Sequence, residues 1–95
     1  MISSPPAEMV GDIVRFQAYA HFACVDPAKN RRRFYTLVWQ PTFWGEVALV
    51  RSWGRLGTEG RSLAALYPDR DSAQPYVEWA IRRRLRRGYQ VVDFK

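Results

Sequence analysis

Residues 51–60, with the sequence RSWGRLGTEG, combine side chains that suit a phosphate-bearing ligand. Guanidinium groups grip phosphate with paired hydrogen bonds, and a flat indole ring stacks on a base or a sugar. In an extended strand Arg51 and Trp53 point to the same face, and we expect the glycine-punctuated turn at 54–60 to leave Arg55 free beside them. The segment is equally compatible with a nucleotide site and with a structural β-turn whose tryptophan packs into the core.

A second group of arginines falls on one face of a predicted helix. At about 100° per residue, Trp79, Arg82, Arg83 and Arg86 lie opposite the apolar stripe of that helix. The pattern is typical of a solvated helix face, and a second binding surface is the alternative that stays open. Arg84 falls on the buried side of the helix, and we expect it to extend out past the helix end.

Side chains that could perform catalysis do not gather in this sequence. His21 is the only histidine and Cys24 the only cysteine. Their odd offset along a predicted strand places them on opposite faces, so they cannot form a dyad. The nine carboxylates are scattered, and neither nucleotide-binding glycine motifs nor a metal-ligand cluster occurs. The sequence predicts a protein that is not an enzyme and has no cofactor, metal or small-molecule substrate.

The net charge favours a polyanionic partner. Fifteen lysines and arginines stand against nine acidic residues, which gives a formal charge of +6. Nucleic acid is the first partner that this excess suggests, and acidic protein or anionic lipid comes next. Residues 31–33 are three consecutive arginines, typical of a solvated loop and also suited to an accessory phosphate clamp. The arginine-rich helix needs its apolar stripe for the core, so we expect no membrane binding.

The compartment is predicted from cysteine use and from the N-terminal residues. A lone Cys24 cannot form an internal disulfide, and it suits the core of a protein in a reducing environment. The first twelve residues do not have the pattern of a signal peptide, and no apolar run approaches membrane-spanning length. We therefore predict a cytoplasmic location.

The residues that position these side chains are predicted to form strands followed by a helix. Period-two alternation along residues 16–24 indicates a strand with one buried face, and turn-forming residues separate the strands after it. The predicted strands are Phe16–Cys24, Arg33–Gln40, Glu46–Trp53, Arg61–Tyr67 and Tyr89–Phe94. The fourth is the weakest, because residues 63–66 also suit a helix.

A change to helical periodicity follows the fourth strand. We expect Asp71 to cap the helix with Gln74 completing a capping box, Pro75 to lie in the first turn, and Gly88 to end the helix. The apolar stripe consists of Ala73, Val77, Ala80, Ile81 and Leu85.

Ninety-five residues allow one domain. We expect residues 1–14 to form a flexible N-terminal arm and residues 15–95 to form the domain. The predicted fold class is α+β, an antiparallel sheet of four to five strands with one amphipathic helix packed across one face.

The motif at residues 53–58, WGRLGT, lies between a predicted strand and a further glycine, and in this setting it resembles the signature of the WGR domain. The residues around it agree. Residues 26–30 and 33–35 resemble the first hairpin of the family, Tyr67 stands where the family usually has a phenylalanine, and residues 87–89 resemble its helix-ending turn. The resemblance covers about residues 17–92.

The resemblance implies a DNA-binding module. The WGR domain occurs in poly(ADP-ribose) polymerases and as a short domain in bacterial proteins, and in the polymerases it engages DNA near a strand break. The motif tryptophan there packs on the terminal nucleotide and the motif arginine contacts the DNA backbone and neighbouring domains, which would assign these roles to Trp53 and Arg55. The strand after the motif differs from the family pattern, because residues 61–66 read RSLAAL where a glutamine and basic residues are common.

We therefore predict a nucleic-acid-binding module that contacts DNA at strand ends, nicks or along the backbone. The residues predicted to bind are Arg51, Trp53, Gly54, Arg55, Arg61, Arg82, Arg83 and Arg86. The alternative is a protein-interaction module without nucleic-acid contact, in which aromatic residues such as Trp44 or Trp79 form the interface.

Overall fold

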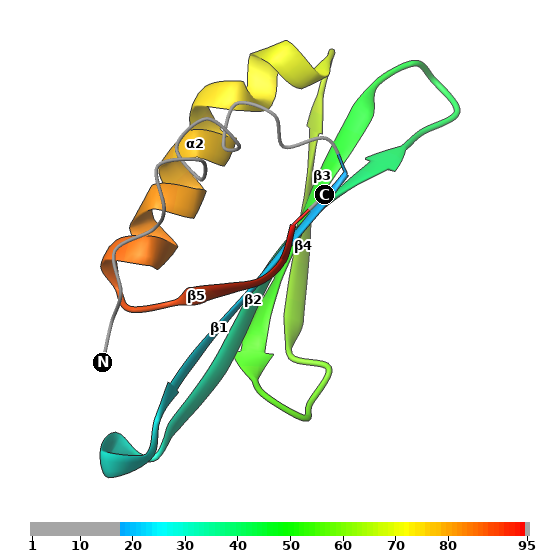
Figure 1. Cartoon of the computed structure of the whole chain (residues 1–95). Coiled ribbons are helices and arrows are strands. Elements are labelled where there is room, and N and C mark those ends of the chain that lie inside the picture. Colours follow the sequence, from blue (N-terminus) through cyan, green and yellow to red (C-terminus); the bar gives the residue numbers. More distant parts are fainter. Residues whose placement is uncertain (1–17, 95) are drawn as a thin grey trace.

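A five-stranded antiparallel sheet with one helix across one face forms the domain in the computed structural model, which describes residues 18–94 (Figure 1). The elements are β1 (Tyr19–Asp26), the short helix η1 (Pro27–Lys29), β2 (Arg31–Pro41), β3 (Val47–Arg55), β4 (Arg61–Tyr67), α2 (Arg70–Arg86) and β5 (Gln90–Phe94). The strand order is β4-β3-β2-β1-β5. The predicted α+β fold class is confirmed, and the predicted arm at residues 1–14 lies outside the described residues.

The core lies between α2 and the covered face of the sheet. Along β1 and β2, alternate side chains are buried, as in a strand with one covered face. The helix contributes four buried residues of its predicted stripe, and Leu85, the fifth, is partly buried. The sheet residues of this core are Ala20, Phe22, Cys24, Tyr35, Leu37, Trp39 and Leu49.

The start of α2 differs from the prediction. The helix begins at Arg70, and the capping residue is Asp69, whose Oδ1 accepts a hydrogen bond from the backbone N–H of Ser72 at 2.8 Å. Both Asp69 and Asp71 suit a cap by type, but Asp69 has the extended backbone that a cap requires. Pro75 consequently lies inside the helix, past its first turn, where it cannot donate the usual hydrogen bond.

The end of α2 agrees with the prediction. Gly88 has a φ of 90°, a left-handed conformation that glycine adopts without strain. The N–H groups of Gly88 and Tyr89 donate to the carbonyls of Leu85 and Arg84, at 3.2 and 3.0 Å. These paired bonds satisfy carbonyls at the helix end and turn the chain into β5.

Candidate nucleic-acid interface

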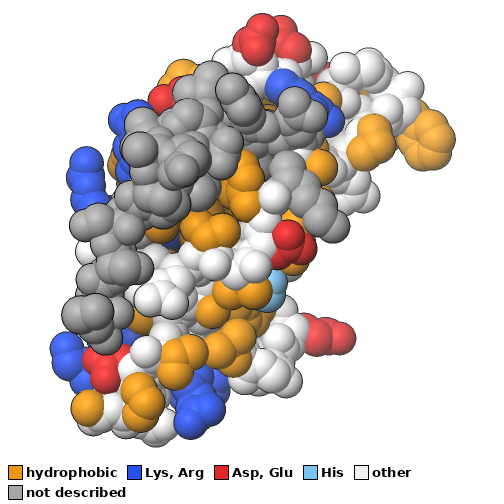
Figure 2. Space-filling view, in the orientation of Figure 1, with side chains coloured by type: hydrophobic (Ala, Val, Ile, Leu, Met, Phe, Trp, Pro, Cys, Tyr) orange, Lys and Arg blue, Asp and Glu red, His pale blue; other side chains and the backbone are white. Residues whose placement is uncertain are grey.

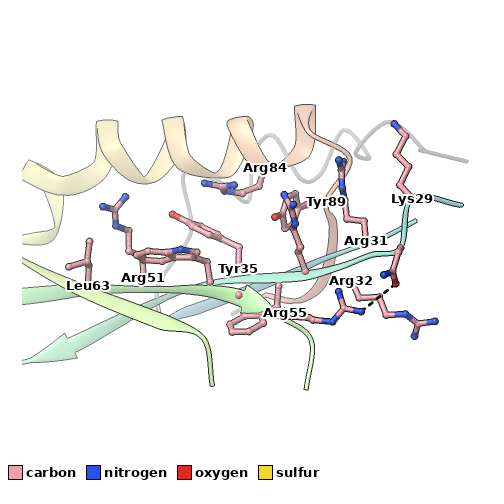
Figure 3. Close-up of a pocket in the computed structure, with 14 residues that line it drawn as sticks. Lys29, Arg31, Arg32, Tyr35, Arg51, Arg55, Leu63, Arg84 and Tyr89 are labelled. Carbon is pink, nitrogen blue, oxygen red and sulfur yellow. Dashed lines mark hydrogen bonds between the residues drawn. The ribbon is translucent and has the colours of Figure 1, made fainter. Parts of the chain in front are cut away.

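The segment predicted to turn after Trp53 continues as a strand. Gly54 and Arg55 are the last residues of β3 and pair with Phe34 and Arg33 of β2, and the turn begins only at Leu56. Strand alternation therefore places the side chains of Arg51 and Trp53 on the covered face, whereas the side chain of Arg55, at the end of the strand, turns away from the helix toward Asn30 (Figure 3).

Close packing explains why glycine stands at position 54. A Cβ atom added to Gly54 would lie 2.7 Å from the Cα atom of Gly60, which is closer than real Cβ contacts allow. Gly60 has a φ of 69°, and the ring of Phe34 packs on both glycines. The glycines therefore let the β3–β4 hairpin close tightly against β2.

Trp53 lies at a broad groove on the covered face of the sheet (Figure 3). The groove encloses about 570 Å³. Seven of its fourteen lining residues are lysine or arginine, four are aromatic, and no described residue that lines it is acidic. The lining consists of Lys29, Asn30, Arg31, Arg32, Arg33, Phe34, Tyr35, Arg51, Trp53, Gly54, Arg55, Leu63, Arg84 and Tyr89.

Arg51 contacts both Trp53 and helix α2. Its Nη1 donates a hydrogen bond to the hydroxyl of Tyr76 on α2 at 2.7 Å. Its guanidinium carbon lies 5.5 Å from the centre of the Trp53 ring, within the range of a cation–π contact. Trp53 is partly buried and packs against the core while it also lines the groove, so its structural and binding interpretations are compatible.

Arg84 points from α2 into the groove, contrary to the prediction that it extends past the helix end (Figure 3). Its guanidinium carbon lies 4.2 Å from the ring centre of Tyr35 and 5.5 Å from that of Tyr89. Stacking on two aromatic rings offsets the cost of placing this charged guanidinium on the buried side of the helix. Arg84 was not among the predicted site residues, although its helical phase and the nearby tyrosines are visible in the sequence.

The hydroxyl of Tyr35 is buried beneath these arginines. Burial, followed by the influence of neighbouring Tyr76, raises the pKa of Tyr35 from 10.0 to about 12, and Arg84 and Arg51 oppose the rise. Tyr35 is therefore neutral at physiological pH. The sheet and the helix are linked at the base of the groove through Arg51, Tyr76, Tyr35 and Arg84.

The outer edge of the groove carries exposed arginines. Arg55 is exposed and donates a weak hydrogen bond to Oδ1 of Asn30 at 3.4 Å, and its strand partner is Arg33 (Figure 3). Arg61 is also exposed and pairs with Trp53 across β3 and β4, but it does not line the groove. The arginine triplet 31–33 also lines the groove, and it forms the start of β2 rather than a loop.

The other predicted arginines lie elsewhere. Arg82, Arg83 and Arg86 line a separate hollow of about 440 Å³ beside Trp79, and the guanidinium of Arg83 lies 5.3 Å from the Trp79 ring centre. Arg82 forms an ion pair with Glu78 at 3.7 Å. The eight predicted residues therefore divide between the β3–β4 region and the helix.

A cationic hollow at the end of α2 connects these two surfaces. It is lined by Arg31, Arg33, Arg84, Arg87 and Tyr89. Four of these residues also line the large groove, and Arg87 also lines the helix hollow. Basic side chains accordingly gather along the helix and around the η1 end of the sheet (Figure 2).

The other side chains considered for catalysis or metal binding do not lie together among the described residues. Cys24 is buried, whereas His21 is partly exposed and contacts Tyr19, with 3.3 Å between the Tyr19 hydroxyl and His21 Nδ1. Between residues 18 and 94, no three histidine, cysteine or acidic side chains are placed to hold a metal ion. Within the same range, no helix is long and apolar enough to cross a membrane.

The sheet, the helix and the aromatic, cationic groove together define a small binding domain. The WGR domain profile matches residues 18–95, and the chain belongs to the WGR domain family. This family is generally one of nucleic-acid-binding modules, and its domain binds rather than catalyses.

Comparison with curated proteins identifies a bacterial relative. The chain is 30% identical over 66 residues to the Uncharacterized protein y4dW of Sinorhizobium fredii (strain NBRC 101917 / NGR234). The match covers 70% of this chain and 32% of that protein, so the chain spans about a third of the length of its relative. No solved structure matches the chain.

Proposed function

We propose that this domain binds DNA through the large groove on the covered face of its sheet. The observation that carries the proposal is the lining of that groove, in which seven cationic side chains surround aromatic rings without an acidic residue among the described ones. Positive grooves with aromatic rings suit nucleic acid, because the cations follow the phosphates while the rings stack on bases.

Trp53 is the proposed stacking residue. Its ring is partly exposed at the groove and is held by packing on the core and by the Arg51 contact. A ring that is already fixed loses little conformational freedom when a base or sugar stacks on it. Arg51 thus has mainly a positioning role, because Tyr76 and Trp53 already engage its guanidinium.

The exposed arginines are the proposed phosphate contacts. Arg33 and Arg55 are direct cross-strand partners, and like charges placed opposite each other destabilise a sheet. A phosphate bound between them would remove that repulsion. Arg61, exposed at the next strand, is proposed to contact the backbone beyond the groove.

The cationic hollow at the end of α2 suggests how a longer ligand continues. Arg87 lies between the groove and the helix hollow, so a DNA segment that leaves the groove can reach Arg82, Arg83 and Arg86. We propose that these arginines add non-specific backbone contacts, and that the domain acts in the reducing cytoplasm, where its free Cys24 is stable.

A titration of labelled nicked, blunt-ended and single-stranded DNA tests the proposal. We expect dissociation constants on the order of micromolar or weaker, rising steeply with salt as counterions are released. Arg55→Gln should reduce the slope of log affinity against log salt by about one, because it removes one phosphate contact. Absence of binding to all three DNA forms at low salt would refute the proposal.

A specific observation favours a second candidate function, protein interaction. At the tip of the β2–β3 hairpin, Phe43 is 99% and Trp44 78% exposed, and no Lys or Arg lies within residues 40–50. Hydrophobic side chains project at this end of the molecule (Figure 2). Exposed aromatics without nearby cations suit a protein interface better than a phosphate backbone.

A pull-down from nuclease-treated lysate tests this second function. We expect the wild-type chain to retain a stoichiometric partner and Trp44→Ser to lose it, since interface hot spots are enriched in tryptophan. Arg55→Gln is the control, because it alters the groove and leaves the hairpin tip intact. Recovery of the same partner by Trp44→Ser would exclude the tip as the contact.

A further inference from the structure

β4 presents an exposed edge of the sheet. It is the last strand in the order, and within the described chain no strand pairs with its outer side. The six residues from Arg61 to Leu66 are all exposed, and the side chains of Leu63 and Leu66 are 52% and 59% exposed. Residues 63–66 place apolar side chains on both faces of this strand.

The two edges of the sheet differ in how they are protected. β5, at the other edge, has five residues, includes Asp93, and pairs with β1 through a register shift at His21 and Phe22. Short length, charge and irregular pairing are devices that prevent edge-to-edge association. β4 has seven residues in regular register with β3, contains no proline, and carries no charge after Arg61.

We propose that β4 pairs with β4 of a second copy of this chain, antiparallel and about a two-fold axis at Ala65. This register is self-complementary, because it places Leu63 of one copy opposite Tyr67 of the other and Ala64 opposite Leu66, with Ala65 opposite its own copy at the axis. Each unlike pair is formed twice by the symmetry, and the paired segment 63–67 carries no charged residue that would repel its copy.

The geometry of antiparallel pairing determines the form of the dimer. A two-fold axis through a residue pair is perpendicular to the sheet, so the two sheets join edge to edge. Both helices and both grooves then lie on the same side. Within β4 this register pairs only residues 63–67 of each copy, an interface smaller than those of stable dimers, and we expect a dimer that dissociates on dilution.

Sedimentation velocity over a range of protein concentrations tests the dimer without any nucleic acid. The sample is kept at high salt, which releases contaminating DNA. We expect the weight-average mass to rise from that of one chain towards that of two as concentration increases. A mass that stays at one chain throughout overturns the proposal.

Substitution at the axis tests the register. Ala65→Lys places two like charges opposite each other, and we expect it to abolish the dimer while circular dichroism stays native. Gln90→Lys is the matched control, because it introduces the same charge on the exposed opposite edge strand, and it should still dimerise. A dimer that survives Ala65→Lys, or that is lost only in Gln90→Lys, contradicts the proposal.

Cross-linking gives an independent reading. Residues paired across the axis have Cα atoms about 4.5–5.5 Å apart, which permits a disulfide. Under mild oxidation we expect Ala65→Cys to form covalent dimers and Gln90→Cys to form none, while the buried Cys24 does not compete. Failure of Ala65→Cys to cross-link in a sample that sediments as a dimer would rule out this register.

Discussion

Individual side chains at the groove combine structural and binding roles. Trp53 packs on the core and lines the groove, and Arg51 holds it through a contact with its ring. The sequence predicted Arg51 and Trp53 from strand alternation and Arg55 from its expected place in the turn, whereas Arg55 is the last residue of β3. Arg84 was missed, because its place in the groove depends on stacking with Tyr35, which is distant in sequence, as well as with the nearby Tyr89.

The buried Tyr35 hydroxyl predicts a loss of stability at alkaline pH. Its pKa is raised to about 12 in the folded domain against 10.0 for the ordinary side chain, so unfolding releases its proton between these values. Ionisation of Tyr35 should leave the free energy of unfolding unchanged below pH 10 and should lower it between pH 10 and 12.

Urea unfolding across this pH range, with the Tyr35→Phe variant alongside, measures the effect. The variant lacks the hydroxyl that titrates, so its free energy of unfolding should decline less at alkaline pH. An equal alkaline decline in both proteins would show that Tyr35 is not its source.

At the scale of elements, the strands and the apolar helix stripe could be predicted, because period-two and helical periodicity indicate which side chains face the core. Two element boundaries could not be predicted. Gly54 suggests a turn by type, but it continues β3 because Gly60 packs against it. The start of α2 depends on which of two nearby aspartates has extended backbone, and composition does not distinguish them.

The cap of α2 gives a prediction at this scale. Asp69→Ala should lower the melting temperature, because it removes the hydrogen bond to the backbone N–H of Ser72, whereas Asp71→Ala should change it much less. Bonds from Ser72 lower the pKa of the Asp69 carboxyl below its usual 3.8. This stabilisation is therefore present above that value and is lost as the pH falls below it.

Thermal unfolding followed by circular dichroism at neutral and acidic pH measures both effects. The difference between the two variants should shrink as Asp69 becomes protonated in the wild-type protein. Equal melting temperatures for Asp69→Ala and Asp71→Ala at neutral pH would contradict the assignment of the cap.

For the whole molecule, the arrangement of charge matters more than its sum. The net charge of +6 favoured a polyanion, but only the fold brings the arginines of residues 31–33, β3 and α2 to one groove. The helix arginines 82, 83 and 86 line a different hollow, joined to the groove at the end of α2. Sequence periodicity predicted each group but could not show where the groups lie relative to each other.

This arrangement predicts an effect that depends on ligand length. Replacing Arg82, Arg83 and Arg86 together by glutamine should weaken binding of a long duplex and leave binding of a short oligonucleotide nearly unchanged. Only a ligand that passes the end of α2 reaches the helix hollow, and there each lost phosphate contact lowers the salt slope by about one. Equal weakening for both lengths, measured by fluorescence anisotropy, would place these arginines at the main binding site.

The most direct test of the central claim is the DNA affinity of a Trp53→Ala variant, measured by anisotropy beside Trp44→Ala. If Trp53 stacks on a nucleotide, its loss should cost about 1–3 kcal/mol of binding free energy, while Trp44→Ala at the hairpin tip should bind as the wild type does. Trp53→Leu keeps an apolar side chain against the core and should lose as much affinity if the alanine variant is unfolded by circular dichroism. Wild-type affinity in a folded Trp53 variant would contradict the proposal that Trp53 stacks on DNA.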